Sequence, residues 1–296
     1  MNDQYIDRIT FGDCRKHLPL LDDESVSLFL SDIPYGISID KWDVLHNNKN
    51  SALLGQSPAQ VGKTGFKRRG KPISGWSTSD RQNMGKEYEA WCRTWVSVVK
   101  PKMKVGSSLF VFGSRRMINR VINAFEDSGF VLKDILAWKK SVAHHRAQRI
   151  SGILEKRGNL EDAKKWEGWR LGNLAPVYEP IAWFVKPQSI STMITDNVLE
   201  NELGAINIAD CQVNGRSPSN MLEIDFAKGE ERVFETQKPL ALMEFLIRLT
   251  TRKGQLVLDP FVGSGTTAIA ASRLERHFVA FENIEETYRL ANERLK

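Results

Sequence analysis

The sequence predicts an α/β fold in which helices cover both faces of a mostly parallel β-sheet. Apolar runs of strand length alternate along the chain with segments whose apolar residues recur at helical spacing. The most regular part is residues 255–295, where a strand, a glycine turn, a helix, a strand and a helix follow one another. With 296 residues, 41% of them hydrophobic, the chain is long enough for one domain with a sizeable core.

The first half of the chain is expected to hold three strands and two helices. In chain order we predict the strand Val26–Leu30, a helix at about Glu87–Val99, the strand 107–113, the helix Arg115–Asp127 and the strand Phe130–Trp138. Pro101 and Gly129 are expected to end the two helices. Residues 36–86 are rich in Gly, Ser, Asn and Lys and show no period, so we expect a long mobile loop there.

The second half is expected to continue the same alternation. In chain order we predict the strand 180–186, the helix Pro239–Thr251, the strand 255–259, the turn 260–265, the helix Thr266–Leu274, the strand His277–Glu282 and the helix Glu285–Leu295. Residues 139–176 look like a basic loop, and residues 188–235 are irregular and polar. We therefore predict a single domain, 1–296, with three insertions at 37–86, 139–176 and 188–235.

The charge distribution favours a polyanionic partner. The formal net charge is +6, yet residues 41–80 and residues 139–170 each carry a net charge of +5. Two basic stretches that also contain glycine and aromatic residues favour binding to a polyanion. No apolar run approaches the roughly 20 residues of a membrane span, and the polar residues 1–10 do not resemble a signal peptide.

The cysteines indicate a reducing compartment. The three cysteines are far apart and have no CxxC or Cys/His spacing, which argues against disulfides and against structural zinc. We therefore expect a cytoplasmic protein with free thiols and no metal site.

A glycine turn near the C-terminal end predicts a nucleotide-type cofactor site. The strand that ends at Asp259 leads into the turn PFVGSGTTA, in which Gly263 and Gly265 let the backbone approach a ligand. The following strand ends at Glu282, where nucleotide-binding βαβ units place an acid against ribose hydroxyls. A dinucleotide fits the same pattern. Asp259 favours a cofactor with a methionine moiety over a dinucleotide, because its carboxylate would repel a pyrophosphate but suits the ammonium of methionine.

A second motif, Asp32-Ile33-Pro34-Tyr35, follows the first buried strand, where open α/β sheets carry their chemistry. The exocyclic amine of a base is a poor nucleophile until its two hydrogens are drawn to fixed acceptors. Asp32 and a backbone carbonyl of the turn could be those acceptors, and Tyr35 offers a flat face for an extruded base. Alone, the motif is more typical of an ordinary turn at the end of a strand.

Together the two motifs resemble the catalytic and cofactor motifs of DNA amino-methyltransferases. Their order, with the catalytic turn first and the glycine turn last, is similar to the β group of that family. Phe11-Gly-Asp-Cys, Thr236-Gln-Lys-Pro-Leu and Arg276-His-Phe-Val-Ala-Phe-Glu extend the resemblance. It implies a Rossmann-like S-adenosylmethionine-dependent methyltransferase sheet with a circularly permuted motif order, mostly parallel with a C-terminal antiparallel hairpin.

The resemblance also implies roles for individual residues. Asp32, Ile33, Pro34 and Tyr35 would engage the target base, with Ile33, where the family more often has proline, contributing its carbonyl. The implied cofactor-binding residues are Asp13, Cys14, Lys238, Asp259, Pro260, Phe261, Gly263, Ser264, Gly265, Thr266, Thr267 and Glu282. Among them, Asp13 is favoured over Cys14 as the adenine contact, Lys238 is expected near the cofactor carboxylate, and Glu282 is expected to hold the ribose.

The partner is expected to be double-stranded DNA, contacted through the two basic stretches. The candidate DNA-binding residues are Lys67, Arg68, Arg69, Lys139, Lys140, His144, Arg146 and Arg149. All three insertions are candidates for DNA recognition. The sequence leaves open a monomer or a homodimer, the recognition sequence, and the presence of a cognate restriction enzyme.

Four alternatives differ in chemistry. Asp at the first position of the turn favours adenine, because cytosine amino-methyltransferases more often have Ser there. An RNA- or protein-directed amine methyltransferase would have the reverse motif order. A nicotinamide dehydrogenase would leave the Asp32 turn unexplained, and a DNA-binding module without catalysis would explain neither motif.

Overall fold

One eight-stranded sheet organises the chain. The structure, a computed structural model, describes residues 4–35, 78–141, 148–172, 174–189, 191, 193–213, 215–234 and 236–296, and describes the side chains of helix residues from 85 onward. The strands of the sheet are β1 (Arg8–Phe11), β2 (Val26–Asp32), β3 (Met103–Phe112), β4 (Val131–Lys139), β7 (Tyr178–Val185), β8 (Met221–Leu222), β9 (Leu256–Asp259) and β10 (His277–Glu282). Their spatial order is β1-β10-β9-β2-β3-β7-β4-β8.

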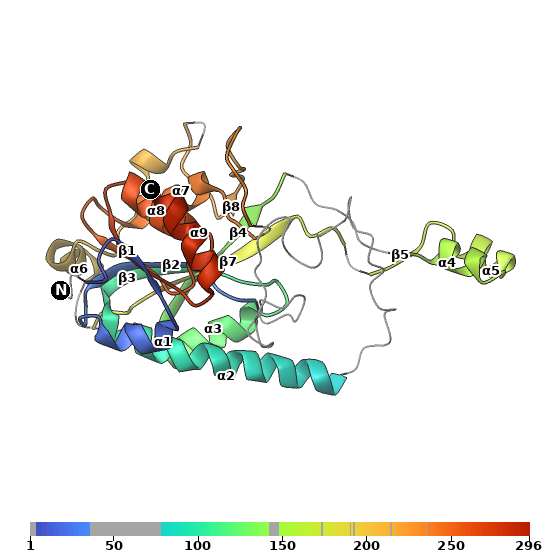
Figure 1. Ribbon diagram of the computed structural model, residues 1–296, viewed down its shortest axis with the longest axis horizontal. Helices are drawn as coiled ribbons and strands as arrows, with labels where there is room; N and C mark the ends of the chain where they lie inside the picture. The colour runs from blue at the N-terminus through green and yellow to red at the C-terminus, as the bar shows by residue number, and fades with distance from the viewer. Residues whose placement is uncertain are drawn as a thin grey trace.

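Helices cover both faces of this sheet. The helices of the main body are α1 (Cys14–His17), η1 (Leu18–Leu20), α2 (Thr78–Lys102), α3 (Ile118–Asp127), α6 (Ile194–Asn201), η2 (Ala209–Cys211), α7 (Leu240–Thr250), α8 (Thr266–Arg273) and α9 (Glu285–Leu295). Figure 1 shows α1, α2 and α3 along one face and α7, α8 and α9 along the other. None of the helices in the described part of the chain is long and apolar enough to cross a membrane.

Two hydrophobic cores lie on the two faces of the sheet. In β2, Phe29 packs in the core beneath α2 and α3, whereas Leu28 and Leu30 pack in the core beneath α7 and α8. This division follows from the alternation of side chains along a strand. Because both faces are covered, the strands are almost continuously apolar, which is the pattern that predicted them. The expected free thiols are confirmed, since Cys14, Cys92 and Cys211 are unpaired and buried.

The mostly parallel sheet is confirmed, but the predicted C-terminal antiparallel hairpin is wrong. The last two strands, β9 and β10, pair in parallel. A helix, α8, connects them and returns the chain to the same end of the sheet, so the second strand runs in the direction of the first. The antiparallel pairings of the sheet are those of β7 with β3 and with β4. The N-terminal end of β7 therefore lies at the edge where β2 and β3 end.

The structure also corrects three segments that were expected to be irregular. α2 begins at Thr78 and not near residue 87, because residues 78–86 contain no proline that would stop a helix, although they are too polar to show a period. Residues 188–235 contain α6, η2 and β8.

The basic segment 139–176 is likewise folded over much of its length. It contains β5 (Gln148–Arg149), α4 (Ile150–Lys156), α5 (Leu160–Lys165) and β6 (Arg170–Leu171), with β5 and β6 paired antiparallel. Asn159 caps α5 by accepting a hydrogen bond from the backbone of Asp162, which helps so short and polar a helix to form. Figure 1 shows α4 and α5 as an arm that projects far from the sheet.

Candidate active site

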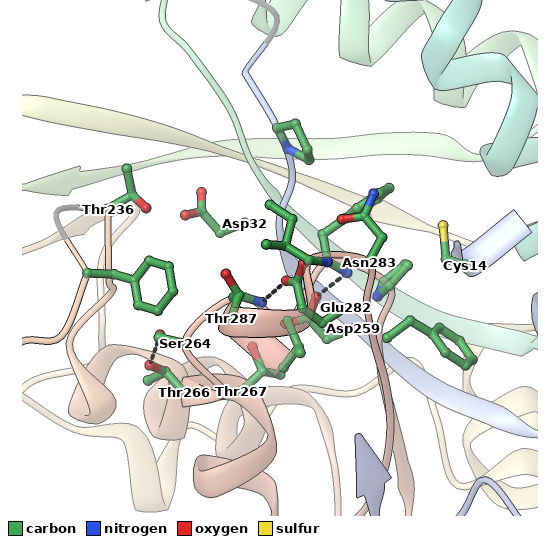
Figure 2. A pocket seen from close by; sticks show the side chains of 18 of the residues that line it. Cys14, Asp32, Thr236, Asp259, Ser264, Thr266, Thr267, Glu282, Asn283 and Thr287 are labelled. Atoms are coloured by element: carbon green, nitrogen blue, oxygen red, sulfur yellow. Dashed lines mark hydrogen bonds between the residues drawn. The ribbon is translucent and has the colours of Figure 1, made fainter. Parts of the chain in front are cut away.

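A pocket opens at the ends of β2, β9 and β10, where the two sequence motifs meet. Asp32 and Pro34 line it from the catalytic turn, and the turn after β9 lines it from the other motif. Figure 2 shows Asp32 on one side of Asp259 and Glu282 and Cys14 on the other. Eleven of the twelve predicted cofactor residues line this pocket; the exception is Gly265, the N-cap residue of α8. Parallel strands end at one edge of a sheet, so residues far apart in sequence converge here.

Two buried carboxylates stand inside the pocket. Asp259 Oδ1 accepts hydrogen bonds from the Ser31 hydroxyl at 2.6 Å and from the Phe261 backbone at 3.1 Å. Glu282 accepts from the backbone of Gly263 at 3.1 Å and of Ile284 at 2.9 Å. Burial raises the pKa of Asp259 to about 6 and that of Glu282 to about 7.

These carboxylates decide which cofactor the pocket fits. A ligand with hydroxyl donors or an ammonium group stabilises buried carboxylates, whereas a pyrophosphate at the glycine turn would meet the like charge of Asp259. The ribose and the methionine ammonium of S-adenosylmethionine supply those donors. The residues present therefore fit this cofactor, and Asp259 disfavours the pyrophosphate of a dinucleotide.

The glycine turn brings the backbone close to α9. Gly263 and Gly265 have φ values of 53° and 81°, in the left-handed region that favours glycine. A Cβ atom on Gly265 would lie 3.2 Å from the Cβ and carbonyl oxygen of Ala291, whereas one on Gly263 would meet nothing closer than 3.9 Å. Glycine is therefore required at position 265 for two reasons, namely its left-handed dihedral angles and its close contact with α9.

This difference gives a matched pair of variants. Gly263→Ala is expected to lower the free energy of unfolding by about 1 kcal/mol, the cost of left-handed backbone alone. Gly265→Ala is expected to cost on the order of 3 kcal/mol, because α9 must also move. Urea denaturation followed by circular dichroism measures both, and equal losses would contradict the close contact as the second cause.

Aromatic side chains form one wall of the pocket. Trp91 and Trp95 of α2 line it together with Phe261, whose ring centre lies 5.5 Å from that of Trp91 and 5.1 Å from that of Trp95. Trp95 is fully buried, as expected of a core residue. The sequence did not predict that these tryptophans also face the pocket. A helix has the same apolar periodicity whether its apolar face covers a core or lines a pocket.

The predicted adenine contact Asp13 is already engaged. Its carboxylate accepts from the backbone and from the guanidinium of Arg15, which is the main reason that its pKa is lowered. Asp13 also caps α1. Cys14 lies beside it in the pocket, where burial raises the pKa of the thiol to about 12, so the thiol stays protonated.

The catalytic turn is fixed by contacts on several sides. The hydroxyl of Tyr88 donates to the carbonyl of Pro34 at 2.6 Å and so holds the turn against α2. Ile33 is buried in the core. The hydroxyl of Tyr35 donates to Glu179 at 3.0 Å. Asp32 Oδ2 accepts from the ammonium of Lys238, while Oδ1 is buried and has no hydrogen-bond partner among the described residues.

Lys238, which was expected near the cofactor carboxylate, lines the pocket, and its ammonium is bound by protein carboxylates. It contacts Asp32 and lies 3.4 Å from Glu179 Oε2, and only 4% of its side chain is exposed. Burial alone would lower the pKa of Lys238, but the two carboxylates outweigh it and raise that pKa. Glu179 was missed in the sequence because it begins a strand whose antiparallel direction no local pattern revealed.

The described DNA-binding candidates are partly engaged within the protein. Lys139 pairs with Glu223 at 2.8 Å between exposed side chains, and Lys140 pairs with Glu179. Arg149 is exposed at the start of the arm. The other candidates, Lys67, Arg68, Arg69, His144 and Arg146, lie outside the described residues.

Comparisons with known proteins agree with this site. The family model described as DNA methylase matches residues 26–293. Type II methyltransferase M.HindIII of Haemophilus influenzae is 45% identical, over 98% of this chain and 95% of that protein. Type II methyltransferase M2.DpnII of Streptococcus pneumoniae is 24% identical, over 97% and 89%.

Solved structures of low identity share the fold. The M1.HpyAVI–SAM complex aligns with a TM-score of 0.56 at 20% identity, over 98% of both chains. PvuII DNA methyltransferase, described as cytosine-N4-specific, aligns with a TM-score of 0.59 at 19% identity, over 97% of this chain and 86% of that one. The fold and the site thus define an S-adenosylmethionine-dependent methyltransferase that acts on DNA. The chain belongs to the DNA methylase family.

Proposed function

We propose that this enzyme methylates the exocyclic amino group of an adenine extruded from double-stranded DNA. The observation that carries the proposal is Asp32, a carboxylate at the end of β2 with one buried oxygen that no described residue bonds. It stands at the pocket that fits the cofactor, beside a tyrosine whose hydroxyl is fixed.

The chemistry follows from what an amine attached to a ring requires. S-adenosylmethionine supplies a methyl group already activated by its sulfonium. The remaining task is to make the amine nitrogen nucleophilic. Asp32 accepts one hydrogen of the amine and stabilises the positive charge that develops on nitrogen during attack. Tyr35 stacks on the base and holds it in line, and the carbonyl of Ile33 accepts the second hydrogen.

Further parts of the proposal concern ligand contacts. Asp259 and Phe261 line the methionine side of the cofactor, Glu282 holds its ribose and Asp13 reaches its adenine. The basic candidates of both stretches contact DNA phosphates, and the three insertions contribute to recognition, the arm of α4 and α5 among them. The naming of the relatives as type II methyltransferases supports a modification enzyme of a restriction system. Such an enzyme acts in the cytoplasm. Its oligomeric state, a monomer or a homodimer, can be measured by light scattering.

Product analysis tests the proposal directly. Incubating the enzyme with labelled S-adenosylmethionine and unmethylated duplex DNA is expected to yield labelled N6-methyldeoxyadenosine after digestion to nucleosides. Adenine is favoured because Asp32, rather than serine, opens the turn. Labelled N4-methyldeoxycytidine would overturn the choice of base. In parallel incubations with RNA or with protein, label found there and not in DNA would overturn the substrate class.

A further inference from the structure

One oxygen of the catalytic carboxylate is occupied before any substrate arrives. The ammonium of Lys238 donates to Asp32 Oδ2, so that an N–H donor of the protein stands against the carboxylate that must receive the target amine. Its nitrogen also lies 5.6 Å from the centre of the Tyr35 ring and 5.3 Å from that of Phe112. The amine of an incoming base can reach the unbonded Oδ1, but it must share the charge of Asp32 with this lysine.

The Lys238 ammonium cannot move into solvent when Asp32 bonds the target amine. Its side chain is 4% exposed, and a buried ammonium without an acceptor is strongly unfavourable. Two other acceptors are in reach, namely the carbonyl of Thr236 at 3.1 Å and Glu179 Oε2 at 3.4 Å. Of these, Glu179 alone carries a charge.

The surroundings of Glu179 keep its carboxylate charged and hold it in place. Burial would raise its pKa, but the ammonium groups of Lys238 and Lys140 outweigh that effect and lower the pKa to about 2. Lys140 contacts one of its oxygens and the Tyr35 hydroxyl the other. The cluster thus contains two carboxylates and two ammonium groups, and its net charge is zero. A shift of Lys238 from Asp32 toward Glu179 keeps its ammonium next to a carboxylate.

We propose that Glu179 is a positioning residue that takes over the Lys238 ammonium when the target amine binds Asp32. The ammonium shifts from a shared position between the two carboxylates to a closer contact with Glu179, and the full charge of Asp32 becomes available to the amine. The same glutamate holds the Tyr35 hydroxyl, so the ring and the acceptor are set by one side chain. This inference rests on the proposed role of Asp32.

The test is Glu179→Gln in the full-length enzyme. Without the second carboxylate, Lys238 keeps its contact with Asp32 and continues to neutralise the charge that stabilises the attacking amine. We expect kcat on unmethylated phage DNA to fall on the order of 100-fold, with the Kd for S-adenosylmethionine unchanged within about threefold. Tyr35→Phe, which removes only the tyrosine contact, is expected to lose less than about tenfold. Glu126→Gln, an exposed position on α3, is the matched control for loss of one charge.

The pH profile separates positioning from a purely structural role. The groups that face Asp32 are Lys238, Glu179, Tyr35 and Asp259. Burial raises the pKa of Asp32, the Lys238 charge lowers it and the Glu179 charge raises it. Removing the Glu179 charge is therefore expected to move the acid limb of kcat to lower pH, while Glu179→Asp keeps the limb in place and recovers most of the rate.

Several results would overturn the inference. They are a Glu179→Gln rate within about threefold of the parent, a loss no larger than that of Tyr35→Phe, or a parallel loss of cofactor affinity. If Glu179→Gln does not fold, an acid limb displaced in Glu179→Asp would overturn it as well. An Asp32→Ala variant at the parent rate would instead refute the proposed catalytic turn, which keeps the two failures distinguishable.

Discussion

Asp32→Ala is expected to lower kcat for DNA methylation on the order of 100-fold or more. The carboxylate bonds the target amine most strongly when charge develops on its nitrogen, so the loss falls on the transition state. The Kd for S-adenosylmethionine should change by no more than about threefold. Single-turnover transfer of labelled methyl to DNA measures the rate, and calorimetry measures the affinity.

The fold should tolerate this substitution. Lys238 loses one partner but still has Glu179 Oε2 at 3.4 Å, so no buried ammonium is stranded. Thermal unfolding of the variant is the control for this point. Asp32→Asn, which keeps the shape and one acceptor oxygen but loses the charge, is expected to fall between the alanine variant and the parent. A parent-like rate for Asp32→Ala would mean that the turn only ends a strand.

The glycine-turn half of the site could be predicted because it is local in sequence. β9, the turn, α8 and β10 are consecutive, and Asp259 and Glu282 end neighbouring parallel strands, which places both carboxylates at one edge. The Asp32 turn joined them by the same rule, since β2 pairs in parallel with β9. Strand ends and parallel direction were enough to bring these residues together.

What could not be predicted depends on strand direction and on contacts without a period. Glu179 sits at the start of its strand, and it reaches the site only because β7 is antiparallel to β3. The contact of Lys238 with Asp32 joins residues 206 positions apart, and family resemblance had assigned that lysine to the cofactor. The arm of α4 and α5 has helices of only seven and six residues, and α5 is polar and capped by Asn159, so a search for long apolar periodicity passes over them.

The other large effect is expected at Glu282. A ribose offers two hydroxyl donors, and hydrogen bonds to a charged carboxylate contribute about 1.5–3 kcal/mol each. Glu282→Gln keeps the size of the side chain but removes its charge. We therefore expect the Kd for S-adenosylmethionine to rise on the order of 100-fold at about pH 8.

The pH dependence of cofactor binding identifies the group responsible. Burial raises the pKa of Glu282 to about 7, so in the free enzyme the carboxyl is largely protonated below that pH. Hydroxyl donors favour the charged form, so binding lowers this pKa and releases a proton.

Affinity in the parent should therefore rise with pH up to about 8 and fall below 7 by up to about tenfold per pH unit. Below about pH 6 Asp259, whose pKa burial raises to about 6, adds to the fall. Calorimetry between about pH 5 and 8, in two buffers of different ionisation enthalpy, measures Kd and proton release together. In Glu282→Gln the slope between about pH 6 and 7 should disappear, while the slope below 6 remains. A variant that binds as tightly as the parent at pH 8, or that keeps the parent slope between 6 and 7, would show that Glu282 does not hold the ribose.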